Sequence, residues 1–169
     1  DFDHADLLDQ DDAGRHLNDD IIDLAAVIAD QDGSQFHIAN VFTVPGEGAM
    51  IAGWIPMTPE NLSDYAKRCE EAAFESLKKL VASSQARLGL DLFDSDRLKT
   101  HIVKGRARAD IPALAERVDA DLIVMGTVGR VGMPGFLIGN TAESILGAIN
   151  CSVLALKPEG FETPVKVDD

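Results

Sequence analysis

The run DLIVMG, residues 121–126, strongly constrains the fold of this chain. Four apolar residues follow one another without a polar interruption, and Gly126 ends the run. Successive residues of a strand point to opposite faces of a sheet, so a strand of this composition is buried on both faces. Such strands are typical of parallel sheets covered by helices on both sides. The run therefore favours an α/β fold.

Strand patterns alternate with helix patterns along the rest of the chain. Apolar residues at helical spacing predict helices, and short runs rich in β-formers predict strands. The predicted helices are 17–30, a long one capped by Thr58 or Asn61 and ending near 88, 110–119 and 140–149; the predicted strands are 36–42, 98–105, 121–126 and 152–157. This alternation indicates βαβ units and a parallel sheet.

These elements form one predicted domain, residues 17–157, between an acidic loop and a tail. Residues 1–20 hold eight aspartates and are predicted to be a solvated loop, and residues 158–169 show no strong pattern. The first predicted element of the domain is a helix. Either the sheet has four strands, or an initial strand is missing from this chain.

The formal net charge of −14 restricts the partners of the chain. Nucleic acid and anionic membranes both require a basic face, so we expect neither as a partner. A small polyanion such as ATP is compatible with this charge, because backbone N–H groups and a nearby cation act at short range. Cys69 and Cys151 form no CxxC pattern, which favours two reduced thiols in a cytoplasmic protein.

A glycine-rich segment, GTVGRVGMPGFLIGNTAE, joins the strand 121–126 to the helix 140–149. In a parallel sheet, ligands bind beyond the carboxyl ends of the strands, where this segment begins. Glycines let the backbone approach a phosphate, the helix start adds N–H donors, and Arg130 would supply a counter-charge. The alternative is that the glycines only make turns. The segment lacks the Gly-Lys-Ser/Thr of a Walker A motif.

This segment, the following CSVLALKP and the preceding HIVKGRARADIPALAERVDADLIVMG resemble the universal stress protein family. Its nucleotide-binding members carry Gly, two residues, Gly, nine residues, Gly and a small polar residue, here Gly126, Gly129, Gly139 and Asn140. The resemblance runs from about residue 17 to the end and is greatest to tandem members with two such domains. It implies a three-layer α/β fold with an open parallel sheet of five strands, ordered 3-2-1-4-5, and helices on both faces. The first, central strand of that order is expected to be missing from this chain.

The resemblance also implies an adenine-nucleotide site. An aspartate near the adenine and ribose would be Asp1, or Asp3 in another register, and an apolar residue near the adenine would be Val41, or Ala39. The residues expected around the phosphates are Gly126, Thr127, Gly129, Arg130, Gly139, Asn140 and Thr141. Asn140 departs from the Ser or Thr of many members, although its amide can still donate a hydrogen bond.

These residues predict a stress-response domain that binds ATP, with Mg²⁺ accompanying it. No residue stands out as a general base, so we expect no efficient enzyme and at most slow hydrolysis. We assign no catalytic and no metal-ligating residue. The alternative function is an interaction module that binds a partner protein or a lipophilic ligand through the apolar loop 43–59. That loop could also fold back as a cover for the long helix.

The sequence contains two further patterns. DQDDAG, residues 9–14, resembles the opening of a calcium loop, but Ala13 and Asp20 stand where Asp or Asn and Glu are required, so an acidic loop is favoured. The strand 152–157 is apolar on both faces, and it is terminal in the strand order that the resemblance implies. We expect it to pair with a second copy of the fold, as a homodimer or a tandem half.

Overall fold

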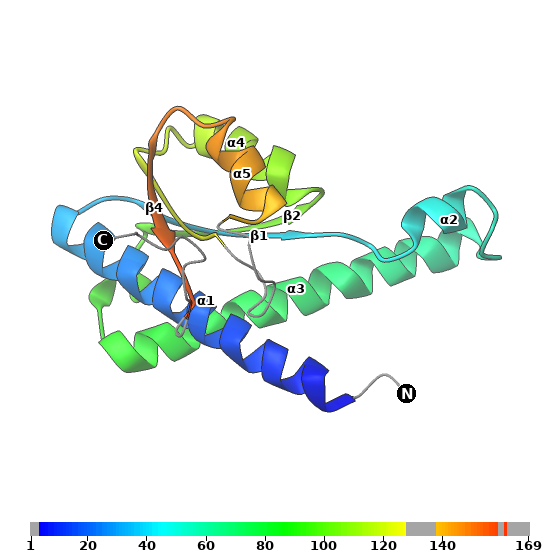
Figure 1. Cartoon of the computed structure of the whole chain (residues 1–169), viewed down its shortest axis with the longest axis horizontal. Helices are drawn as coiled ribbons and strands as arrows, with labels where there is room; N and C mark the ends of the chain where they lie inside the picture. Colours follow the sequence, from blue (N-terminus) through cyan, green and yellow to red (C-terminus); the bar gives the residue numbers. More distant parts are fainter. Residues whose placement is uncertain (1–3, 128–137, 159–160, 162–169) are drawn as a thin grey trace, which may run out of the picture.

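The computed structural model describes residues 4–127, 138–158 and 161, with the backbone alone for residues 4–16. Strands lie between α4 and α5 on one side and α1 and α3 on the other (Figure 1). In chain order the elements are α1 (His4–Asp32), β1 (Phe36–Phe42), α2 (Glu47–Ile51), α3 (Pro59–Leu88), the 3-10 helix η1 (Asp91–Asp94), β2 (Leu98–Lys104), α4 (Ala107–Arg117), β3 (Leu122–Gly126), α5 (Asn140–Leu146) and β4 (Ser152–Leu156). The predicted alternation of helices and strands, and with it the α/β class, is confirmed.

The strands of the described residues form two separate parallel pairs. β1 pairs with β2 from Phe36 opposite Leu98 to Phe42 opposite Lys104. β3 pairs with β4 from Leu122 opposite Ser152 to Gly126 opposite Leu156. No hydrogen-bonded ladder joins the two pairs within these ranges. The parallel direction agrees with the prediction, and the five-strand order stays a prediction.

Helix α1 differs from the prediction at its start. The backbone is helical from His4 to Asp32, so residues 4–20 are helical where an acidic loop was predicted. Aspartates near a helix N-terminus are stabilised by the partial positive charge there, which explains why an Asp-rich stretch can extend this helix. The apolar residues that fix α1 on the body come later, at Leu17, Ile22, Ala26 and Ala29, all of them buried.

Helix α3 begins as the sequence predicts. The Thr58 hydroxyl accepts a hydrogen bond from the Asn61 amide at 3.2 Å, and Pro59 occupies the first helical position. Thr58 is therefore the cap, rather than Asn61. Gly89 ends the helix in the left-handed region, at φ 60°, where a residue without Cβ is unstrained.

The core has two parts. The larger part joins α1, β1 and η1, and it includes an edge-to-face contact between Phe36 and Phe93 with ring centroids 6.3 Å apart. Its buried members are Ile22, Ala26, Ala29, Phe36, Leu92 and Phe93. The smaller part lies where α4 and α5 contact each other, and Leu114 of α4 and Ala142 and Ile145 of α5 are buried. Among the described residues, no helix is long and apolar enough to cross a membrane.

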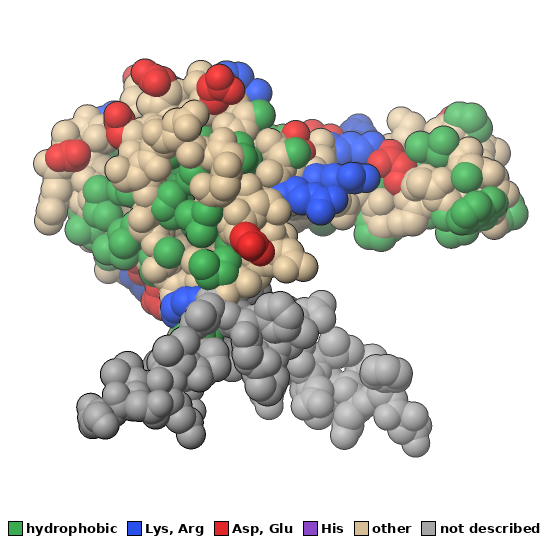
Figure 2. Space-filling view, turned by 45° about the horizontal axis from the view of Figure 1, so that its top comes forward, with side chains coloured by type: hydrophobic (Ala, Val, Ile, Leu, Met, Phe, Trp, Pro, Cys, Tyr) green, Lys and Arg blue, Asp and Glu red, His purple; other side chains and the backbone are tan. Residues whose placement is uncertain are grey.

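Residues 43–58 form an arm that extends from the body together with the first turns of α3 (Figure 1). The arm contains α2, which the sequence did not predict, and Glu47 of α2 makes an ion pair with Lys104 of β2. Trp54 is 84% exposed and Ile51 is 71% exposed. Hydrophobic side chains gather at the far end of the arm (Figure 2). Trp54 and Ile51 thus do not cover the long helix, which was one of the two alternatives for this loop.

Candidate functional site

The two described ends of the glycine-rich segment meet at the carboxyl end of β3. The Thr127 amide donates to the Leu156 carbonyl at 3.1 Å, so this residue continues the β3–β4 ladder beyond Gly126. The Gly139 amide in turn donates to the Thr127 carbonyl at 2.7 Å. Residues 128–137 lie outside the described residues. The segment therefore leaves and returns at one point of the sheet edge, directly before α5.

Gly139 is the cap residue of α5, with extended backbone at φ −75° and ψ 149°. No side chain caps the helix, and neither Asn140 nor Thr141 is its cap residue. Both residues begin the helix and are exposed. The first N–H groups of a helix have no acceptor within it, and they carry the partial positive end of the helix dipole. The arrangement offers several hydrogen-bond donors at one point.

Two of the glycines have packing reasons to be glycine. A Cβ on Gly126 would lie 2.9 Å from the Leu17 Cδ2 atom and 3.3 Å from the Ile21 Cδ1 atom. A Cβ on Gly139 would lie 3.3 Å from the Thr127 carbonyl oxygen. Helix α1 thus packs directly on the end of β3, and Gly126 permits that contact. Sequence spacing alone could not distinguish this role from the approach of a ligand.

The other predicted site residues are distributed differently. Asp1, Gly129 and Arg130 lie outside the described residues. Val41 is half-buried near the end of β1, where it pairs with Val103 of β2. The structure therefore brings together Gly126, Thr127, Gly139, Asn140 and Thr141, and it places Val41 on the other strand pair.

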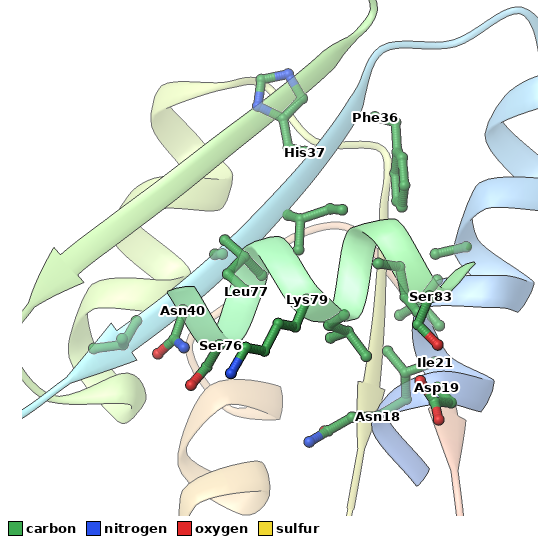
Figure 3. Close-up of a pocket in the computed structure, with 17 residues that line it drawn as sticks. Asn18, Asp19, Ile21, Phe36, His37, Asn40, Ser76, Leu77, Lys79 and Ser83 are labelled. Carbon is green, nitrogen blue, oxygen red and sulfur yellow. The ribbon is translucent and has the colours of Figure 1, made fainter. Parts of the chain in front are cut away.

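A cleft of about 720 Å³ lies between β1 and β3, because Val41 of β1 and Val124 of β3 both line it. Its inner surface is apolar and comes from α1, β1 and α3, with Ile21, Ile22, Phe36, Ile38, Leu77 and Leu80. Asn40 and Ser76 lie at one end of the cleft, and Asn18, Asp19 and Ser83 lie toward the other (Figure 3). The sequence did not predict this cleft, because its walls come from elements far apart in the chain.

A second cleft, of about 610 Å³, lies between the same two strands on the side of α4. It is lined by Ile111 and Leu114 of α4, by Val118 directly after that helix, and by β3 from Leu122 to Met125. The residues that line both clefts are Ala25, Phe36, His37, Ala39 and Val124. A cleft therefore lies between β1 and β3 on each face of the strand layer.

Arg87 fixes α3 to α1 beside the first cleft. Its guanidinium donates to Asp23 through Nε at 2.7 Å and Nη2 at 2.9 Å, and to Asp19 at 3.1 Å. Buried Ser84 also donates to Asp23. Partial burial by itself would raise the pKa of Asp23, but the hydrogen bonds from Arg87 and Ser84 outweigh it and lower the pKa. The fold thus favours the ionised form of Asp23, paired with Arg87, over the protonated form.

Replacing Arg87 by Met is expected to lower the free energy of unfolding by about 1–2 kcal/mol, because a charge-assisted network is lost while the aliphatic stem is kept. The side chain is one-third exposed, so the effect is smaller than for a buried pair. The Asp23 contribution is present above the ordinary aspartate pKa near 4 and is lost as the pH falls through its lowered value. Urea unfolding of both proteins at pH 7 and pH 3 checks this. A difference between them that is as large at pH 3 as at pH 7 would contradict the carboxylate role.

The comparisons with known proteins agree with this fold. The model of the universal stress protein family matches residues 14–157. Universal stress protein E of Salmonella typhi is 34% identical over 122 residues, and that of Escherichia coli strain K12 is 33% identical; the match covers 70% of this chain and 38% of each relative. The chain thus spans well under half the length of these curated relatives. The solved structure of UspA from Lactobacillus plantarum is 19% identical with a TM-score of 0.53, covering 80% of this chain and 86% of that one, and shows a similar fold. The chain therefore belongs to the universal stress protein family.

Proposed function

We propose that this domain binds an adenine nucleotide, ATP, at the carboxyl end of β3, with at most slow hydrolysis. The observation that carries the proposal is the 2.7 Å hydrogen bond from Gly139 to the Thr127 carbonyl. It holds both ends of the glycine-rich segment beside the first turn of α5. A phosphate beside this turn would meet backbone N–H groups and the exposed side chains of Asn140 and Thr141.

The remaining roles follow from the same proposal. Gly129 and Arg130 would contact the phosphates, and Val41 would lie near the adenine at the wall of the first cleft. Asp1 would contact the adenine and ribose. Mg²⁺ would be held mainly by phosphate oxygens and water, since it often requires few protein ligands when a nucleotide is bound. Among the described residues, no group of three or more His, Cys, Asp or Glu is arranged to hold a metal.

The experiment that tests the nucleotide proposal is direct. The purified protein is denatured, and the supernatant is analysed by mass spectrometry for adenine nucleotides. Calorimetric titration with ATP then measures binding to protein freed of nucleotide. Release of ATP or measurable binding supports the proposal. Absence of both, in protein with a cooperative unfolding transition, would overturn it.

We also propose the five-strand order 3-2-1-4-5 for the complete sheet, with a further strand between β1 and β3. The described β1–β2 and β3–β4 pairs would be strands 2-3 and 4-5 of that order. The two clefts support this, because they open at the same place on both faces of the layer. Hydrogen exchange on the protein purified from cells tests it. The amides that decide are those of β1 that point toward β3 and those of β3 that point toward β1. Rapid exchange of both sets would contradict the further strand.

A second candidate function is an interaction module that uses the arm. The exposure of Trp54 and Ile51 favours it, because large apolar side chains that project together commonly mark a binding surface. Such a module would bind a partner protein or a lipophilic ligand without a nucleotide. Trp54 is the single tryptophan of the chain, so its fluorescence reports on this surface. A blue shift of the Trp54 emission on binding, together with weaker binding by Trp54→Ser in a calorimetric titration, would support this function. Unchanged binding by that variant would count against it.

The β4 edge is expected to pair with a second copy of the fold, between two chains or between tandem halves. β4 is bonded to β3 on one side among the described residues, and Leu154 and Leu156 are only half-buried. An apolar edge strand of this kind is usually covered. Sedimentation at micromolar concentration should show a dimer, or a longer chain in which two copies pack together. A stable monomer with an uncovered edge would contradict this. Location in the cytoplasm stays a prediction.

A further inference from the structure

Two histidines form a direct hydrogen bond between β1 and β2. The Nδ1 atom of His37 and the Nε2 atom of His101 are 3.0 Å apart, and the ring planes differ by 10°. The ring centroids are 5.2 Å apart. Ring nitrogens lie on the ring edge, so these two distances place the rings edge to edge in nearly one plane. The contact is therefore an in-line N–H···N bond rather than a face-to-face stack.

This bond limits how many protons the pair can hold. A neutral imidazole has one N–H donor and one acceptor nitrogen, whereas a protonated imidazole has two donors. The N–H···N bond needs one donor and one acceptor. It is compatible with two neutral rings, or with one neutral and one protonated ring. With both rings protonated, two donors and two like charges would face each other at this distance.

The surroundings of the pair oppose double protonation. His37 stands directly opposite Lys99 in the strand register, and His101 lies near Arg117 at the end of α4. Partial burial and the Lys99 charge lower the pKa of His37. Partial burial, His37 and Arg117 lower the pKa of His101. Three aspartates line the same cleft as His37, namely Asp32, Asp119 and Asp121, and none of them is a cause of either shift.

We propose that the His37–His101 hydrogen bond is a pH-sensitive link between β1 and β2. The bond is present when the two rings together carry at most one added proton, and it breaks when both rings are charged. His37 also lines both clefts, so loss of this hydrogen bond would increase the mobility of β1 where it lines both of them. The inference does not depend on nucleotide binding. It assigns a role in pH response to two side chains that the predicted site does not use.

The direction of the response follows from linkage. Each ring titrates near pH 6.5 in the unfolded chain and at lower pH in the folded chain. At a pH between these values the unfolded chain binds more protons. The contribution of the pair to stability is therefore complete above about pH 6.5 and is lost progressively as the pH falls.

The experiment compares the full chain with His37→Gln, His101→Gln and the double variant. Urea unfolding is measured from pH 7.5 to pH 5.0, and imidazole NMR resonances are followed over the same range. Between these limits, the folding constant of the parent should fall about tenfold more than that of the double variant, because the unfolded parent chain takes up more protons than the folded one. The coupling between the two single changes should be present at pH 7.5 and absent at pH 5.0. Equal pH dependence of the parent and the double variant would overturn the proposal.

A charge variant keeps the test valid if the histidine variants do not fold. Lys99→Gln removes the positive charge opposite His37 and should move the titration of the pair to higher pH. Lys78→Gln is the matched control, because Lys78 lies on the exposed surface of α3. It should leave the titration unchanged. Two histidines that titrate independently near pH 6.5, with no effect of Lys99→Gln, would also overturn the proposal.

Discussion

Leu92→Ala is expected to lower the free energy of unfolding by about 2–5 kcal/mol. Leu92 is fully buried in η1, the short 3-10 helix between α3 and β2. It belongs to the core cluster with Phe93, Phe36 and three residues of α1. Removing its isobutyl group loses apolar burial and leaves a cavity. The surrounding strand and helices can close that cavity only in part.

The measurement is the midpoint and slope of urea unfolding at pH 7.5. Leu24→Ala is the matched control, because Leu24 lies on α1 with 37% exposure and Ala is a strong helix former. We expect a much smaller loss for this control. If the two variants lost the same amount, the core would not have its centre at η1.

Gly129→Val is expected to weaken ATP binding by at least about a hundredfold, which corresponds to about 2.7 kcal/mol. The expectation depends on the nucleotide proposal and on the spacing of Gly126, Gly129 and Gly139. A β-branched side chain would occupy space that the phosphates need and would restrict the backbone that must bend around them. Gly129 itself lies outside the described residues, so spacing alone carries this expectation.

Calorimetric titration of parent and variant with ATP gives the two dissociation constants. Gly48→Val in α2 is the matched control, because a Cβ at Gly48 would meet no atom within 4 Å. This control should bind ATP as the parent does. A Gly129 variant that keeps the affinity of the parent, with unfolding unchanged, would show that the phosphates do not approach this glycine.

The sequence predicted the strands better than the helix ends. The strand 36–42 agrees with β1 at both ends, and the other three strands agree within one residue. These signals are local, because a short apolar run and its flanking turn residues specify extended backbone by themselves. The start of the long helix was predicted at Thr58 or Asn61 for the same reason, and Thr58 is the cap. The start of α1 at His4 was not predicted, because aspartates favour both loops and the first turns of helices.

For the candidate site, the sequence identified the glycine-rich segment and its place after a buried strand. It could not show that the Gly139 amide bonds to the Thr127 carbonyl, or that Leu17 of α1 occupies the space beside Gly126. It also gave no reason to connect His37 with His101, which are 64 residues apart. These contacts depend on which strands become neighbours and on where a helix crosses them.

By itself, then, the sequence determined the order and type of the four strands and four longer helices that were predicted, but not α2 or η1, because hydrophobic periodicity, caps and turn residues act over a few residues. Only the tertiary structure decided how the four described strands divide into two pairs, where the clefts open and which charges meet. The Arg87 contacts with Asp19 and Asp23 illustrate this, since they join residues of α3 and α1 that are more than sixty positions apart in the chain. Such contacts form only when packing brings distant segments together, and no local pattern specifies them.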